Sequence, residues 1–189
     1  MECYNTKERI VDAALRTVNE LGFAKATIDD ITREAGISKG GFLYHFPTKN
    51  ACFLAVVDRC FDLIYQSALL HRRNLREGPG RMLKAYVLAW LEWQEPPSSI
   101  PVLGLFEDLE LRCRAIEHRD RHYQLVLDGA IPDLLVQTVL LTCAGLWTTP
   151  IMSRATPQEL SIFRQKMRGV LINMIDDCIN RDGGIVKGI

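Results

Sequence analysis

Apolar residues recur at every third or fourth position along most of this chain, the spacing of helices that bury one face. They predict a first helix that is capped by a box of Asn5 and Glu8 and ends at Gly22. Further helices are expected from Thr48 to about 73, over 81–94, from Ser98 or Ser99 onwards and, in one or two pieces, over 107–127. We therefore predict an all-α fold.

The stretch from Thr27 to Lys49 predicts two short helices joined by a tight turn. Thr27 and Asp30 form a capping box that starts the first helix, and Gly36 ends it because glycine tolerates a left-handed turn. Ser38 then caps a second helix, which runs over about 39–44 before Pro47 blocks continuation. This order is typical of a helix-turn-helix whose second helix enters a DNA major groove.

The outward side of that second helix suits a groove. Lys39 and His45 can reach phosphates or base edges, Tyr44 lies beside them, and Gly40 and Gly41 let the backbone come close. Each glycine weakens the helix by about 1 kcal/mol relative to alanine, so both need another reason. An ordinary helical hairpin with solvated charges is the alternative.

Charge supports DNA binding only locally. The whole chain carries 23 basic and 23 acidic residues and has a pI near 6.9, so binding must come from a patch. From Ala35 to Val57 there is no acidic residue, whereas Lys39, His45 and Lys49 lie within that segment. With no signal peptide and no apolar run of about 18 residues, we expect a cytoplasmic protein that does not enter a membrane.

A larger set of residues over 6–57 shares one spacing pattern: Glu20, Leu21, Gly22, Phe23, Thr27, Ile31, Ala35, Gly36, Ile37, Ser38, Gly40, Phe46 and Lys49. Through these residues the segment resembles the TetR family of bacterial transcriptional regulators. The resemblance implies that Thr27, Lys39, Tyr44, His45 and Lys49 contact phosphates or bases, and Ser38, Gly40 and Gly41 complete the predicted DNA-binding set. The resemblance also implies a DNA-binding domain over 1–47 and a helical effector-binding and dimerisation domain over 48–189.

Two positions depart from the commonest family pattern. Thr32 replaces an alanine, and its hydroxyl is expected to bond back to the Ile28 carbonyl. Leu43 replaces a phosphate-contacting tyrosine, while Tyr44 stands one residue later, about 100° around the helix. Either Tyr44 serves differently or Leu43 packs inside.

The C-terminal part predicts a self-association surface. Residues 132–147 are apolar on nearly every side, and the helix expected over 156–181 carries a second apolar stripe. We expect a homodimer through 132–149 and 156–181, which fits a palindromic operator. The alternative is a central helix pair within a monomer.

The family resemblance also implies a ligand pocket. Its predicted lining is Trp90, Trp93, Leu103, Phe106, Tyr123 and Trp147. A pocket lined by these apolar side chains would take a small, largely apolar effector, and no cofactor is expected. The alternative is that these aromatic residues belong to the core, which is the more common role of aromatics at helical spacing.

Other chemistry finds little support. Cys113, His118 and His122 lack a fourth ligand for a metal site, and the two histidines are interpreted as part of a solvated face. No phosphate loop, nucleophile motif or carboxylate pair indicates an enzyme.

The leading hypothesis is a ligand-responsive, homodimeric repressor. The alternatives are a helical small-molecule-binding protein or enzyme with a vestigial helix-turn-helix, and a regulator triggered by oxidation of Cys3 or another thiol.

Overall fold

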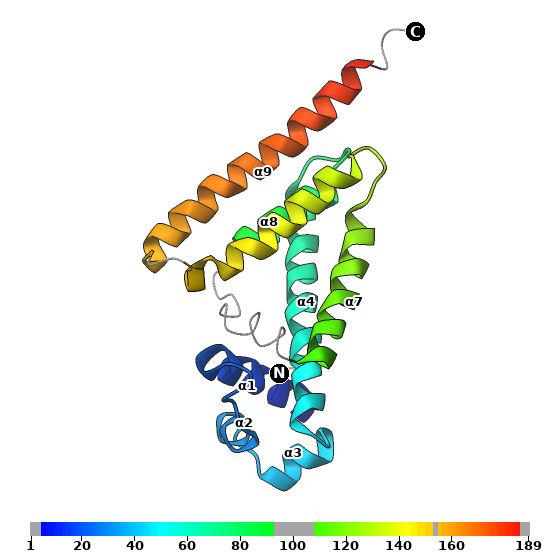
Figure 1. The fold of residues 1–189 in the computed structure, drawn as a ribbon. Coiled ribbons are helices and arrows are strands. Elements are labelled where there is room, and N and C mark those ends of the chain that lie inside the picture. The colour runs from blue at the N-terminus through cyan, green and yellow to red at the C-terminus, as the bar shows by residue number, and fades with distance from the viewer. Residues whose placement is uncertain (1–4, 93–107, 153–154, 186–189) are drawn as a thin grey trace. The chain divides into compact units, whose positions relative to one another are not determined.

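The computed structural model describes residues 5–92, 108–152 and 155–185, and these ranges contain helices and no strands (Figure 1). The all-α prediction is confirmed. The helix expected from Ser98 or Ser99 lies outside the described residues, and none of the described helices is long and apolar enough to span a membrane. The helices are α1 (Thr6–Leu21), α2 (Ile28–Ala35), α3 (Lys39–His45), α4 (Lys49–Asn74), α5 (Arg81–Leu91), α7 (Leu109–Val126), α8 (Asp133–Met152) and α9 (Pro157–Ile185).

The helices belong to two compact units, each with its own hydrophobic core. The first unit contains α1, α2 and α3, together with α4 up to Asp62 and α7 up to His118. The second contains the rest of α4 and α7 with α5, α8 and α9. These units describe packing, and the functional boundary predicted after residue 47 stays a prediction.

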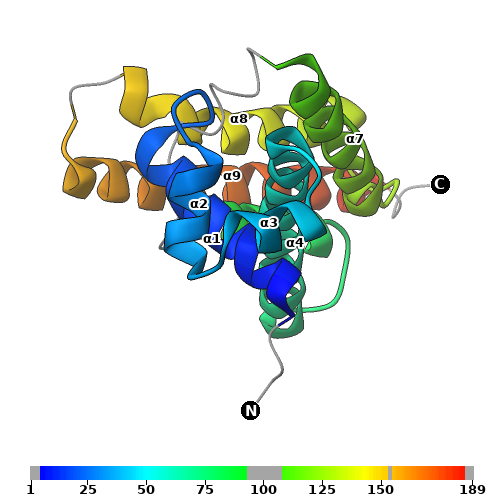
Figure 2. The same cartoon turned by 90° about the horizontal axis from the view of Figure 1, so that it is seen from below.

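In the first unit, α1 and α2 pack together and α3 follows α2 directly (blue in Figure 2). The Asn5 side chain caps α1 by accepting a hydrogen bond from the Lys7 amide at 3.1 Å. The predicted box with Glu8 is therefore corrected to a cap on the next residue but one. The side chains that are fully buried in this unit include Ile10, Val18, Ile31, Phe42 and Val56.

The start of α7 packs on α4 through a buried histidine, which corrects the predicted solvated face. His118 is only 4% exposed, and its Nε2 lies 2.7 Å from Oδ1 of Asp58. Nε of Arg114 lies 2.8 Å from the same oxygen, and the Phe61 ring stacks on the imidazole at 4.9 Å. Spacing along α7 places its histidines on one side, but it cannot reveal that α4 covers that side.

The core of the second unit surrounds α5, which packs against α8 and α9. Gly80 precedes α5 with φ +69° and donates its amide hydrogen to the Asp128 carboxylate. A Cβ at Gly80 would lie 2.7 Å from Ile131 and 2.9 Å from Ile175, so packing as well as backbone conformation requires glycine there. The α8 and α9 helices run further than predicted, to Met152 and Ile185 respectively.

An aromatic cluster lies in this second core. His122 is 8% exposed, contrary to the predicted solvated face, and its ring lies 5.3 Å from Tyr86 and 6.0 Å from Tyr65. Tyr86 is 1% exposed, and within the described part of the chain its hydroxyl has no hydrogen-bond partner. Burial raises the pKa of this phenol well above its ordinary value, so the hydroxyl stays neutral.

Replacing Tyr86 with phenylalanine should stabilise the protein. A buried hydroxyl without a partner costs free energy of desolvation, so we expect Tyr86→Phe to raise the free energy of unfolding by about 1 kcal/mol. Urea unfolding followed by circular dichroism measures the change, and Tyr44→Phe, at an exposed tyrosine, should leave stability unaltered. A loss of stability in Tyr86→Phe would show that the hydroxyl is bonded.

Candidate nucleic-acid interface

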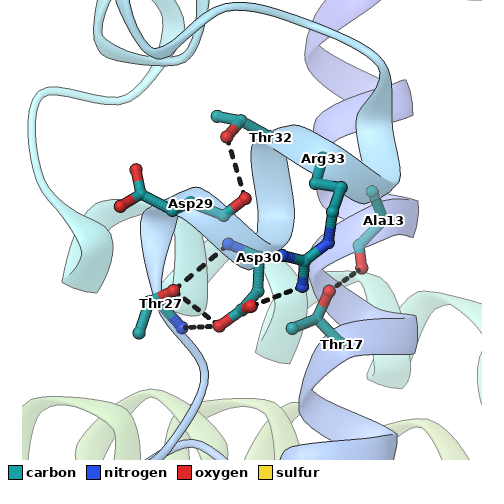
Figure 3. A network of polar contacts seen from close by, with 7 residues as sticks. All are labelled: Ala13, Thr17, Thr27, Asp29, Asp30, Thr32 and Arg33. Atoms are coloured by element: carbon teal, nitrogen blue, oxygen red, sulfur yellow. Dashed lines mark hydrogen bonds and ion pairs between the residues drawn. The ribbon is translucent and has the colours of Figure 1, made fainter.

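The N-terminus of α2 is fixed by the predicted capping box (Figure 3). The Asp30 amide donates to Oγ1 of Thr27 at 3.1 Å, and the Thr27 amide donates to the Asp30 carboxylate at 3.1 Å. Arg33, one turn later, donates to the other carboxylate oxygen at 2.6 Å. Hydrogen bonds from Thr27, and then from Arg33, lower the pKa of the Asp30 carboxyl below its ordinary value.

The turn between α2 and α3 follows the predicted pattern with one correction. Gly36 takes the left-handed conformation, with φ 64° and ψ 40°, and the Ile37 amide donates to the Thr32 carbonyl at 3.1 Å. The Thr32 hydroxyl bonds to the Asp29 carbonyl at 3.1 Å, not to the Ile28 carbonyl, because it reaches back three residues (Figure 3). Ser38 caps α3 as predicted, by accepting from the Gly41 amide at 3.1 Å.

The α3 helix has a buried side and an exposed side. Phe42 is fully buried and Phe46, the residue after the helix, is 3% exposed, so these two rings anchor α3 in the core of the first unit. Leu43 is 45% exposed, which excludes the alternative that it packs inside, and Tyr44 is 86% exposed. We define the outer face of α3 as Lys39, Gly40, Leu43 and Tyr44, which are all exposed.

The two α3 glycines are not required by the protein's own packing. Neither has a positive φ. A Cβ at Gly40 would meet only Oγ of Ser38 at 3.9 Å, and one at Gly41 would meet that atom at 3.4 Å. Because side chains would fit, the glycines leave open space against which another molecule can come close to the backbone.

The lysines of segment 35–57, which is predicted to be positive, have partners that its sequence does not reveal. Nζ of Lys39 lies 3.3 Å from Oδ1 of Asp29, which α2 brings alongside. Nζ of Lys49 donates to the Ala26 carbonyl at 3.1 Å and lies 5.3 Å from the centre of the Phe53 ring. Both ammonium groups are therefore held by neighbours within the fold. A count of acidic residues along 35–57 misses these neighbours, because Asp29 and Ala26 lie outside that segment.

The predicted ligand-binding residues belong to the second unit only in part. Trp90 and Tyr123 are half-buried and pack against the core of that unit. Trp147 lies in α8, but its side chain is outside the described set, and Trp93, Leu103 and Phe106 lie outside the described residues. Tyr86 and His122 were missed as candidates, although Tyr86 shares the helical spacing of Leu83 and Trp90.

The described thiols and the described His, Cys, Asp and Glu side chains are the candidates for a second site. Burial raises the pKa of the Cys52 and Cys143 thiols to about 12, which disfavours the reactive thiolate. Cys113 is exposed, and Cys3 lies outside the described residues. In the part of the chain that is described, no three His, Cys, Asp or Glu side chains gather as a metal site would require.

Comparison with known proteins places these features in context. Residues 10–56 match the family model described as "Bacterial regulatory proteins, tetR family". The "Uncharacterized HTH-type transcriptional regulator YerO" of Bacillus subtilis is 44% identical over 189 residues, which cover 92% of this chain and 64% of YerO. The chain thus spans less than two thirds of the length of that relative.

Two solved structures share the fold. The fatty acid degradation regulator FadR from Bacillus halodurans superimposes with a TM-score of 0.69 at 16% identity, over 90% of this chain and 96% of FadR. The multidrug binding protein EbrR, complexed with malachite green, gives a TM-score of 0.66 at 19% identity, over 89% and 97% of the two chains. At these identities the likeness concerns the fold alone.

Because of the Asp30 cap of α2, the stability of the folded protein should change with pH in the acid range. Because the folded pKa of Asp30 is lowered, its contribution is complete above about pH 4 and is lost as the pH falls through the folded value. Asp30→Ala should therefore lower the melting temperature at pH 7, and the difference from the unmodified protein should shrink towards pH 2. Thermal unfolding across this range measures it, with Glu20→Ala as a control for loss of an exposed acid. A difference independent of pH would contradict the role of the carboxylate.

Proposed function

Because this chain belongs to the TetR family of bacterial regulatory proteins, we propose that it is a ligand-responsive, homodimeric regulator of transcription that represses its target. The observation that carries the proposal is the outer face of α3, which α2, the Gly36 turn and the buried Phe42 hold outward. A dimer bound over a promoter blocks polymerase without any further contact, which favours repression. The protein would act in the cytoplasm, where bacterial DNA lies.

The proposed DNA contacts divide between phosphates and bases. The exposed Tyr44 hydroxyl suits a phosphate, because side-chain hydroxyls commonly donate to phosphate oxygens. Thr27, at the start of α2, is proposed as a second phosphate contact on the family resemblance. Lys49 uses one of the three ammonium hydrogens on the Ala26 carbonyl and keeps donors for a phosphate. Lys39 lies on the outer face of α3 itself. Ser38, Gly40, Gly41 and His45 complete the proposed contact set.

The proposed dimer uses α8 and α9, over residues 132–149 and 156–181. On α8, Leu134 and Leu141 lie seven residues apart on one side and are 75% and 63% exposed. On α9, Phe163, Val170 and Met174 repeat at similar spacing and are 43%, 49% and 37% exposed. Large apolar side chains gathered on adjacent helices favour association, and a two-fold dimer suits a palindromic operator.

The proposed effector is a small, largely apolar molecule bound in the second unit. Its proposed lining is Trp90, Trp93, Leu103, Phe106, Tyr123 and Trp147, and the Tyr86 hydroxyl adds one buried polar group that an effector can satisfy. The structure of EbrR, which shares this fold, is complexed with a small molecule, malachite green. Coupling to DNA would run through α4, which supplies residues to both units, provided that the effector prefers one of two states.

Selection of bound fragments from random duplex DNA by the purified protein tests the proposal. We expect a palindromic sequence to be enriched. Lys39 and Lys49 from two copies would neutralise about four phosphates, so affinity for the winner should fall about a hundredfold between roughly 50 and 200 mM salt. No enrichment, or binding that is indifferent to sequence and salt, would refute the proposed function. Lys39→Ala should make the dependence of DNA affinity on salt less steep, whereas Lys166→Ala, on α9, should leave it unchanged.

The Lys39–Asp29 ion pair predicts a variant that binds DNA more tightly. Asp29→Asn removes a carboxylate from beside Lys39, so the lysine no longer has to give up a partner when it meets a phosphate. We expect about a three- to tenfold gain in affinity at low salt, and this gain should shrink as the salt concentration rises and screens the exposed ion pair. Glu34→Gln is the matched control, because Glu34 pairs with Arg16 on α1 at 2.7 Å. Unchanged or weaker binding in Asp29→Asn would place Lys39 away from the DNA backbone.

A further inference from the structure

The outer face of α3 has an unusual set of side chains for a surface that is proposed to recognise DNA sequence. It contains one cation, one glycine, one leucine and one tyrosine, and α3 as a whole has no Arg, Asn, Gln, Asp or Glu. Those five residue types supply most of the hydrogen-bonded readout of guanine, adenine and cytosine. The ammonium of Lys39, the one cation on this face, is already paired with Asp29. Hydrogen bonding therefore offers this face little discrimination between base pairs.

The apolar member of the face is centrally placed and accessible. Leu43 lies one helical turn after Lys39 and three residues after Gly40, so all three are neighbours on the helix surface. Its side chain is 45% exposed, while its neighbour Phe42 supplies the anchor in the core. At Gly40 no side chain stands in the way, and a Cβ built there meets nothing closer than 3.9 Å. A base edge can therefore approach Leu43 over the bare backbone.

We propose that Leu43 determines operator specificity by packing against the C5 methyl group of a thymine in each half-site. The proposal rests on the proposed DNA-binding function and names the part of the DNA that the outer face of α3 recognises. Thymine alone among the four bases carries a methyl group in the major groove, so apolar contact there separates it from the rest. Tyr44, at 86% exposure, is left for the sugar-phosphate backbone.

The contact between Leu43 and the thymine methyl group should make a measurable contribution to DNA affinity. Removing one buried methyl-sized group from an apolar contact weakens binding about fourfold, from the usual transfer free energy per carbon. In a palindromic site bound by two copies, the two fourfold losses multiply, so removal of both methyl groups should cost about fifteenfold.

Replacement of thymine by deoxyuridine isolates this contact, because deoxyuridine forms the same base pair and lacks only the methyl group. Each thymine of the operator selected from random duplexes is replaced in turn, symmetrically in both half-sites, and affinity is measured at one fixed salt concentration. We expect about a fifteenfold loss at one symmetric position or two adjacent ones. In Leu43→Ala the affinity for the thymine operator should fall by a similar factor, and the further loss with deoxyuridine at that position should disappear.

Two variants separate this effect from a general disturbance. Leu21→Ala truncates a leucine of similar exposure, 41%, at the end of α1 and should keep the full response to deoxyuridine. Leu43→Met keeps an apolar side chain and should retain most of the response, which an unfolded or shifted α3 would not.

The outcomes distinguish this inference from the function on which it rests. Specific binding in which every deoxyuridine duplex stays within twofold of its thymine parent would overturn the role of Leu43 and leave the DNA-binding function standing. Equal deoxyuridine penalties in the unmodified protein and Leu43→Ala would also overturn it, because the methyl group would then be read by another residue. Absence of any enriched duplex would overturn both.

Discussion

The burial of Phe42 is the interaction on which the rest of the first unit's surface depends. A seven-residue helix with two glycines is too short and too weak to persist alone in water. It persists because Phe42 is fully buried and Phe46 nearly so, which fixes both the position of α3 and its rotation about its own axis. That rotation decides which four residues form the outer face. Truncating Phe42 would therefore remove the face as a defined surface rather than alter one contact on it.

Local features of the sequence predicted the caps and the turn of α2 and α3, because their partners lie within four residues. The Thr27–Asp30 box, the left-handed Gly36 and the Ser38 cap each follow from one or two side chains and the backbone beside them. The outward direction of Lys39 and Tyr44 follows from helical spacing once the anchor is known. The all-α fold class could likewise be predicted, because the apolar residues repeat with the period of a helix along most of the chain.

What could not be predicted depends on partners far away in the chain. Asp58 precedes His118 by 60 residues, so α7 alone made that histidine look like a surface residue. Asp29 precedes Lys39 by ten residues and reaches it only because the Gly36 turn folds α3 back beside α2. A segment without acids therefore looked more positive than its surroundings make it. The cap of α1 differs for a smaller reason, because Asn5 satisfies a nearer amide than the box would require.

The pairing of Lys39 with Asp29 has a consequence for how such a protein would search a chromosome. A lysine that already has an internal counter-charge gains less from an arbitrary phosphate than a bare one, while the whole chain carries no net charge to hold it on DNA. Residence on the vast excess of unrelated sequence is then brief, and few copies are sequestered there. A cell could occupy a handful of operators with a small pool of molecules, because little of that pool is lost to the rest of the genome.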